Sequence, residues 1–476
     1  MAKSKAAKRK RNAQVDLPQK LPKATTLTPP LDGEPKHLRT LVADEELDIT
    51  TETLTALAQY PNLTKSKACK DLRVAVYEFR QACTTGVNTA EGANLTARIT
   101  GALADEKYVD AKILLAEMRI RGEQPKIGAL CRWVRDLDVV SGLSTQPAFD
   151  RKEKNTQLLS VLDAILRVST PIDTNPNAVT STATSSIAFQ SVWDLRPSTA
   201  SLPIYASVLD KSILNEAPAS PSSIRIIEQT AGPLRKPPNH HPAILYTTVP
   251  NAVPLSPVSS SITYYPHPAV PGLGLALDVL SPAECRAIIA AGESVNFIPD
   301  APLREDGDIS ILAHNFYWII DTTFHDILWA RISPYVPPSI NGRLVRGINR
   351  RFRVYRYVPG AEYRCHIDGA WPPSGILPDD TYVYDSSPKE KKQSSMYTFL
   401  LYLNDEFEGG ETTFFMPAAR EGILNAYPVR PVMGAVAIFP HGESNGALLH
   451  EGTGVRKGAK YIIRTDVEYD VEPSES

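Results

Sequence analysis

The sequence predicts an α+β protein of several domains, with helices in its N-terminal third and strands in its C-terminal half. The length of 476 residues suits two or three domains better than one. Apolar residues recur at three- and four-residue spacing over residues 45–165, which is the period of an amphipathic helix. Short runs rich in Val, Ile, Tyr, Phe and Thr follow one another after residue 343, a spacing typical of a β-sandwich or jelly roll.

Composition excludes several classes of protein. The formal net charge of −2 gives no general attraction to nucleic acid or membrane. The sequence has no apolar run of the roughly 18 residues that a membrane span needs. A secretory signal has a hydrophobic core after its basic residues, and none follows the basic N-terminus here. The five cysteines form no CxxC pair, so we expect reduced thiols in an intracellular protein, nuclear or cytoplasmic.

Residues 1–44 are predicted to be a disordered basic tail. The first twelve residues carry six Lys and Arg and no acid. Such a run is typical of a nuclear-localisation or nucleic-acid-binding segment, and equally of a solvated chain end.

Residues 45–170 are predicted to form a small helical domain. The segment 95–125 indicates two antiparallel helices broken near Lys107, and another helix is expected over 127–137. The hairpin resembles one unit of a pentatricopeptide-type repeat. Repeat arrays need about three units to bury a core, so an ordinary helical hairpin is the preferred interpretation. Under either interpretation the domain is a candidate for partner binding.

Residues 171–270 are predicted to be a linker rich in Pro, Ser and Thr. Of the chain's 40 prolines, 16 lie between Pro171 and Pro271, and a VTSTATSS run occupies 179–186. Such a composition buries too little apolar surface to offset chain entropy.

Residues 271–470 are predicted to form the β-rich domain, followed by a tail at 471–476. Its first helix has Ser281 as N-cap, Pro282 at the first helical position and Glu284 completing a capping box, and it should stop near Gly292. A second helix is predicted over 322–332. Strands are predicted over residues 343–358, 361–368, 396–404, 410–416, 433–439, 446–451 and 459–469.

The strand ending in His366, Ile367 and Asp368 carries the candidate chemistry. Because alternate strand residues share a face, His366 and Asp368 point to one side while Ile367 points away. His450, on a later predicted strand, is the obvious third ligand, and His441 is its competitor in a predicted loop. Two His and one carboxylate on one face of an octahedron are typical of non-haem Fe(II) oxygenases.

With these ligands in place, residues 273–470 resemble the 2-oxoglutarate- and Fe(II)-dependent dioxygenases, in the prolyl 4-hydroxylase-like branch. The matching pieces are LSPAEC at 280–285, YRY at 355–357, YRCHID at 363–368, LYLND at 401–405, FEGGET at 407–412 and the segment 450–460. The resemblance implies a double-stranded β-helix (jelly roll) with flanking helices. It also implies Fe(II), 2-oxoglutarate and O2 as cofactors, with ascorbate as a further candidate.

The resemblance assigns roles to individual residues. It implies that His366, Asp368 and His450 bind Fe(II), and that the basic residue ten positions after the distal His, Lys460, meets the far carboxylate of 2-oxoglutarate. Arg464 lies on the same strand face and competes for that role. Tyr357 is expected to support the same carboxylate, and Tyr363 is expected to line the pocket.

The resemblance implies hydroxylation of an unactivated C–H bond with release of succinate and CO2. The substrate is expected to be a protein, with prolyl residues as candidates, or a small molecule, and residues 370–395 are a candidate lid. A nucleic-acid oxidative dealkylase is the weaker alternative, motivated by the basic tail and the arginines between 343 and 356. A vestigial, non-catalytic binding module is the third. The sequence does not predict an oligomeric state.

Overall fold

The structure is a computed structural model that divides the chain into two compact units, Met1–Arg80 and Gln81–Ser476. It describes residues 39, 42–85, 94–137, 153–179, 186–197, 202–218, 221–236, 238–257, 261–303, 313–379, 381–443 and 445–473. The expected basic tail therefore lies almost wholly outside the described residues, as does the second half of the expected C-terminal tail, 474–476. Within the described ranges, no helix is both long enough and apolar enough to cross a bilayer.

The first unit is helical. It contains α1 (Asp44–Ala58), α2 (Pro61–Thr64), a 3-10 turn at Lys67–Cys69 and the start of α3 (Lys70–Thr85). At the start of α1 the Glu46 carboxylate accepts a hydrogen bond from the Ala43 backbone N–H at 3.1 Å, which caps the helix. No residue of α1 is buried, so local signals rather than a core define this helix.

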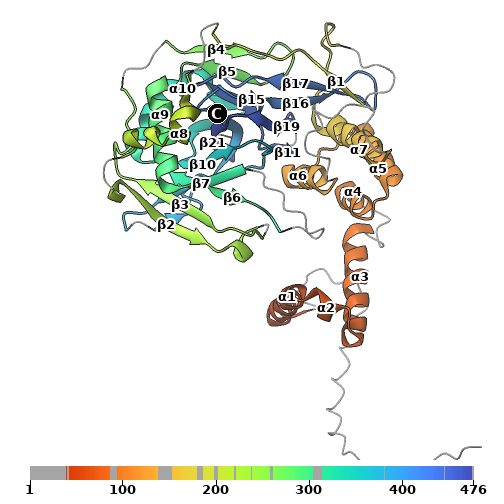
Figure 1. The fold of residues 1–476 in the computed structure, drawn as a ribbon. Helices are drawn as coiled ribbons and strands as arrows, with labels where there is room; N and C mark the ends of the chain where they lie inside the picture. Colours follow the sequence, from red (N-terminus) through yellow and green to blue (C-terminus); the bar gives the residue numbers. More distant parts are fainter. Residues whose placement is uncertain are drawn as a thin grey trace, which may run out of the picture. The chain divides into compact units, whose positions relative to one another are not determined.

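Helices α4 to α7 begin the second unit (Figure 1). They span Leu95–Ala104, Tyr108–Arg121, Ile127–Asp136 and Glu153–Ser169. As predicted, the first two form a hairpin that breaks at Lys107, and α5 ends at Gly122, which adopts a left-handed φ of 66°. Such a cap favours glycine because no Cβ opposes it.

These four helices share a core with the neighbouring sheet rather than forming their own domain. Leu162 and Ile165 of α7 lie in one apolar cluster with Cys365, Ile367 and Leu449 of the sheet region. The expected helical domain at 45–170 thus differs from the structure, which divides that range at residue 80. The apolar faces of α4–α7 and the outer face of the small sheet are buried in this one cluster.

The smaller of the two main sheets has the order β1-β17-β16-β19-β11 within the described residues. These strands are Ile187–Phe189, Leu424–Val429, Thr412–Pro417, Leu449–Gly452 and Tyr363–His366. Its outer face contacts the helices (Figure 1), and its inner face contributes Phe414 and Tyr427 to a second core.

The larger sheet has the order β2-β3-β7-β10-β21-β14-β18-β5-β4 along its main path, as far as the described residues go. Its strands are Ile224–Thr230, Ala243–Thr248, Ala313–Ile319, Arg351–Tyr357, Lys460–Asp470, Gln393–Tyr402, Val436–Pro440, Gly274–Leu277 and Thr263–Pro266. The short strands β6 (Ile298–Asp300), β8 (Ser339–Ile340) and β9 (Arg343–Ile348) extend it at the side. Tyr355 and Tyr402 on its inner face meet the small sheet in the shared core.

Helices cover the outer face of the large sheet (Figure 1). They are α8 (Ile204–Leu209), α9 (Pro282–Val295) and α10 (Thr322–Ile332). The predicted capping box of α9 is confirmed, since Ser281 accepts from the Glu284 backbone N–H and Glu284 accepts from the Ser281 N–H. The helix continues past Gly292 to Val295 because Gly292 is buried against Phe297 and Phe316 instead of ending the helix.

The expected linker at 171–270 contains regular structure. β1 pairs in parallel with β17, and β2 to β4 belong to the large sheet. The local sequence made Ile187–Leu195 and Ala243–Val249 candidate strands, but the partner of β1 lies more than 200 residues away along the chain, so the pairing could not be predicted. The second unit thus mixes helices and strands, with two facing sheets between helical layers.

Candidate metal centre and cofactor pocket

Two neighbouring strands of the small sheet bring the predicted histidines together. β11 and β19 run antiparallel, and their register places His366 directly opposite His450. Asp368 follows the end of β11 by two residues and lies in the same pocket. Ile367 and Cys365 point into the helix-covered core instead, as the alternation of strand side chains predicts.

The three side chains converge on one point. One nitrogen from each histidine and one Asp368 oxygen all lie within 4.8 Å of one another. His366 Nε2 is 3.4 Å from Asp368 Oδ1, and His450 Nε2 is 3.6 Å from Asp368 Oδ2. Each Nδ1 lies against the carbonyl of the residue two positions earlier, Arg364 O at 2.7 Å and Leu448 O at 3.1 Å. The Nδ1 atoms donate there, which leaves both Nε2 lone pairs for a metal ion.

Burial and charge prepare these groups as ligands. Burial alone would raise the pKa of Asp368, but Arg464 and the two imidazoles outweigh it and hold the pKa well below its ordinary value. Burial lowers the pKa of His450 to about 3. A charged carboxylate beside a neutral imidazole is the protonation state that metal binding needs, so the donor set fits Fe(II).

The ligands open onto a pocket with about 410 Å³ of empty space. Tyr355, Tyr357 and Tyr363 line it beside His366, together with Lys460 and Arg464. The predicted cofactor residues therefore all reach one cavity.

Lys460 and Arg464 occupy different ends of this pocket. Lys460 Nζ donates to the Gly410 carbonyl at 2.7 Å and lies 5.4 Å from the centre of the Tyr357 ring. Gly410 has φ of 70°, and a Cβ there would approach Phe407 to 2.8 Å, which explains the glycine. Arg464 instead lies 3.3 Å from Asp368 Oδ1 and 3.0 Å from Asp466 Oδ1.

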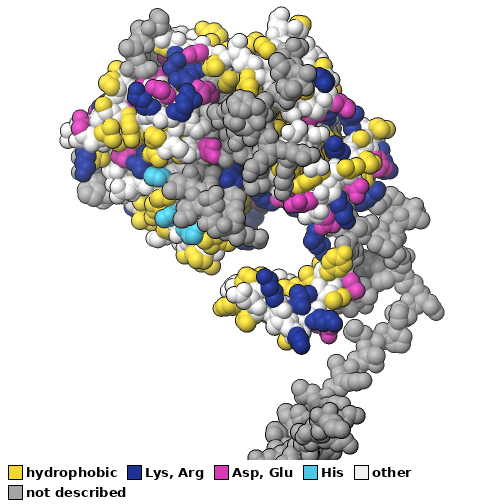
Figure 2. Space-filling view, turned by 45° about the vertical axis from the view of Figure 1, so that its right-hand side comes forward, with side chains coloured by type: hydrophobic (Ala, Val, Ile, Leu, Met, Phe, Trp, Pro, Cys, Tyr) yellow, Lys and Arg dark blue, Asp and Glu magenta, His cyan; other side chains and the backbone are white. Residues whose placement is uncertain are grey.

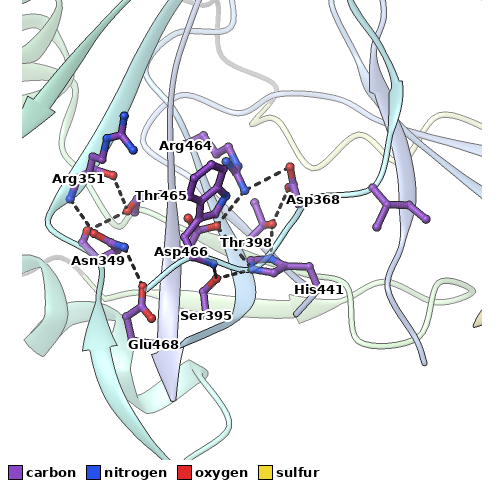
Figure 3. Close-up of polar contacts among 12 residues, drawn as sticks. Asn349, Arg351, Asp368, Ser395, Thr398, His441, Arg464, Thr465, Asp466 and Glu468 are labelled. Carbon is purple, nitrogen blue, oxygen red and sulfur yellow. Dashed lines mark hydrogen bonds and ion pairs between the residues drawn. The ribbon is translucent and has the colours of Figure 1, made fainter. Parts of the chain in front are cut away.

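Asp368 also contacts Thr398, a residue to which the sequence gave no role (Figure 3). Thr398 Oγ1 donates to Asp368 Oδ2 at 2.7 Å and also contacts His441 Nδ1 at 2.7 Å. His441, the competing ligand in the sequence, is outside the ligand group. The polar residues Ser395 and Thr398, both buried in β14, were the available signal.

Comparison with known proteins identifies the domain that holds this site. Residues 352–465 match the 2OG-Fe(II) oxygenase superfamily. The chain carries a 2OG-Fe(II) oxygenase domain. The family implies Fe(II), 2-oxoglutarate and O2, and the ligand group lies within the matched residues.

The oxygenase domain is similar to prolyl hydroxylases. Prolyl 4-hydroxylase 1 of Arabidopsis thaliana is 27% identical over 203 residues, which cover 39% of this chain and 64%, less than two thirds, of that relative. A viral collagen prolyl hydroxylase of Paramecium bursaria Chlorella virus-1 is 19% identical over 42% of this chain and 97% of its own, with a TM-score of 0.26. A Pseudomonas putida prolyl-4-hydroxylase is 18% identical over 42% and 91%, also with a TM-score of 0.26.

The buried Lys460 makes the stability of the oxygenase domain depend on pH. Burial lowers the pKa of Lys460 from 10.5 to about 7. Between these values the unfolded chain holds a proton that the folded chain has lost, so stability rises with pH across this window. Without cofactors, Lys460→Met should therefore stabilise the protein at pH 7, by roughly 2–4 kcal/mol, and by much less near pH 10.

Thermal unfolding of the cofactor-free protein at the two pH values measures this effect. Lys457→Met is the matched control, because the Lys457 side chain is 79% exposed. The same rise in melting temperature for Lys460→Met at both pH values would contradict the lowered pKa of Lys460 in the folded protein.

Proposed function

We propose that the domain is an Fe(II)- and 2-oxoglutarate-dependent dioxygenase that hydroxylates an unactivated C–H bond, releasing succinate and CO2. The observation that carries the proposal is the convergence of His366, Asp368 and His450 within 4.8 Å at a pocket with a buried cation. The site lies between two facing sheets, which we interpret as a double-stranded β-helix.

Each residue has a role that its position supports. His366, Asp368 and His450 hold Fe(II). When 2-oxoglutarate is bound, this ion would catalyse the oxidation of the substrate by O2. Lys460 Nζ receives the far carboxylate of 2-oxoglutarate as a charge-assisted pair, with Tyr357 beside it. Arg464 is too close to the ligand Asp368 for this task, because the two ends of the five-carbon acid lie roughly 5 Å apart.

A protein substrate with a prolyl target fits the surroundings of the pocket best. The similar Arabidopsis protein is named a prolyl 4-hydroxylase. The rings of Tyr355 and Tyr363 line the pocket beside the ligands, and such faces suit a pyrrolidine ring. The segment after Asp368 offers the half-exposed rings of Trp371 and Tyr384, whose centroids are 6.3 Å apart, for contact with flanking peptide residues.

The arginines that motivated a nucleic-acid substrate are largely neutralised. They form ion pairs that join Arg343 to Glu443, Arg346 to Asp470, Arg353 to Asp300 and Arg356 to Glu293. Figure 2 shows basic and acidic side chains interspersed on the visible face. Phosphate binding needs uncompensated cations, so this pattern favours the peptide over the nucleic acid.

Succinate release tests the proposal. With Fe(II) and 2-oxoglutarate, proline-containing peptides should stimulate release above the substrate-free rate, and alkylated oligonucleotides should not. His366→Ala is the negative control. Stimulation by oligonucleotides alone would contradict the peptide assignment, and wild-type release no greater than that of His366→Ala would contradict the enzymatic activity.

A further inference from the structure

A buried chain of polar groups runs from Asp368 through Thr398 and His441 to Ser395 (Figure 3). It ends at the backbone N–H of Trp371. Asp368 Oδ2 contacts Thr398 Oγ1 at 2.7 Å, and Thr398 Oγ1 contacts His441 Nδ1 at 2.7 Å. His441 Nε2 contacts Ser395 Oγ at 2.8 Å, and Ser395 Oγ accepts from the Trp371 N–H at 3.0 Å. Ser395, Thr398 and His441 are at most 3% exposed.

The carboxylate end of the chain fixes the direction of its hydrogen bonds when His441 is neutral. A backbone N–H only donates, so Ser395 accepts from Trp371 and is free to donate to His441 Nε2. A neutral His441 then carries its proton on Nδ1 and donates to Thr398. Thr398 passes its single hydroxyl hydrogen to the carboxylate of Asp368. Both ring nitrogens of His441 are thus engaged, which explains why this histidine is not a ligand.

A β-bulge aligns the two hydroxyl residues of β14. Ser395 and Thr398 are three residues apart and would face opposite sides of a regular strand. The pairing of β14 with β21 shifts register between Ser395 and Tyr397, and one extra residue turns both side chains toward His441. The chain of contacts depends on this irregularity.

We propose that His441, acting through Thr398, is a positioning residue that fixes the orientation of the Asp368 carboxylate for Fe(II). The proposal rests on the proposed metal centre. The terminal torsion of an aspartate is soft, and here Thr398 holds Oδ2 while Arg464 lies 3.3 Å from Oδ1. A carboxylate held at both oxygens is already ordered before the metal binds, so metal binding does not have to order it. Groups that orient ligands in this way typically contribute about 10–100-fold to metal affinity.

Two conservative variants of His441 separate positioning from packing. In His441→Asn the side-chain amide takes the place of Nδ1 and still donates to Thr398. In His441→Gln the longer side chain takes the place of Nε2, so Thr398 loses its donor. The probe is Mn(II), with bound metal measured by electron paramagnetic resonance in the full chain, so that no turnover is needed.

We expect His441→Gln and Thr398→Val each to raise the Kd for Mn(II) about 10–100-fold. His441→Asn should stay within about threefold of the wild type. The double variant His441→Gln/Thr398→Val should bind no more weakly than Thr398→Val alone, because His441 acts through Thr398. Wild-type affinity in His441→Gln, equal losses in the Asn and Gln variants, or additive losses in the double variant would each overturn the positioning role.

The wild type and His366→Ala distinguish this result from a failure of the metal centre. Wild-type binding that is lost in His366→Ala supports the centre, and the His441 variants then decide the positioning role. A wild type that binds Mn(II) no better than His366→Ala would overturn the centre and the positioning role together.

Discussion

Replacing His366 with alanine is expected to lower 2-oxoglutarate turnover by about 10³-fold or more, since loss of the metal removes several kcal/mol of stabilisation. His366 supplies one of the three convergent ligand atoms. Two ligands, Asp368 and His450, do not retain the ion at the concentrations of an assay. Metal content after gel filtration and succinate formation measure the loss together.

The loss should be specific to the ligand position. His240→Ala is the control, because His240 is exposed and lies outside the ligand group; it should keep wild-type turnover and metal content. The melting temperature of cofactor-free His366→Ala should stay close to that of the wild type, since His366 is only partly buried. Turnover above a tenth of the wild-type value in His366→Ala would contradict the assignment of this ligand.

Removing the Lys460 ammonium is expected to raise the KM for 2-oxoglutarate about 30–150-fold, the effect of losing a buried charge pair of about 2–3 kcal/mol. Lys460 is 2% exposed, at the end of the pocket marked by Tyr357 and Gly410. Because the far carboxylate is remote from the reacting atoms, the change should appear mainly in KM, with kcat nearly kept at saturating 2-oxoglutarate. Initial rates of Lys460→Ala against 2-oxoglutarate concentration measure both constants.

Arg464→Gln is the matched variant for this prediction. Arg464 lines the same pocket on the same strand but lies against Asp368 and Asp466. At saturating iron its KM for 2-oxoglutarate should rise less than about threefold, because the far carboxylate does not reach it. If Arg464→Gln raised the KM more than Lys460→Ala did, the two roles would have to be exchanged.

The metal centre was predictable because its geometry is local. Alternation along one strand places His366 and Asp368 in the pocket and Cys365 and Ile367 in the core. The step that the sequence could not supply is the register that sets His366 opposite His450. The resemblance implied that His366, Asp368 and His450 meet, and the strand pairing brings their side chains together.

The structures of the helical region and of the expected linker were harder to predict from the sequence. The apolar stripes of α4–α7 predict helices, but they do not reveal that their partner is a sheet built from residues beyond 360. The strand Ile187–Phe189 pairs with Leu424–Val429, a contact between segments that share no local signal. The contacts of His441 were missed for a similar reason, because they depend on a bulge in β14.

A crystal grown without oxygen in the presence of Fe(II) and 2-oxoglutarate, with anomalous data at the iron edge, tests the central claim most directly. The account predicts one iron peak about 2 Å from Nε2 of His366, Nε2 of His450 and a carboxylate oxygen of Asp368, with the far carboxylate of 2-oxoglutarate on Lys460. An iron peak bound by His441, or no peak among these three side chains, would contradict it.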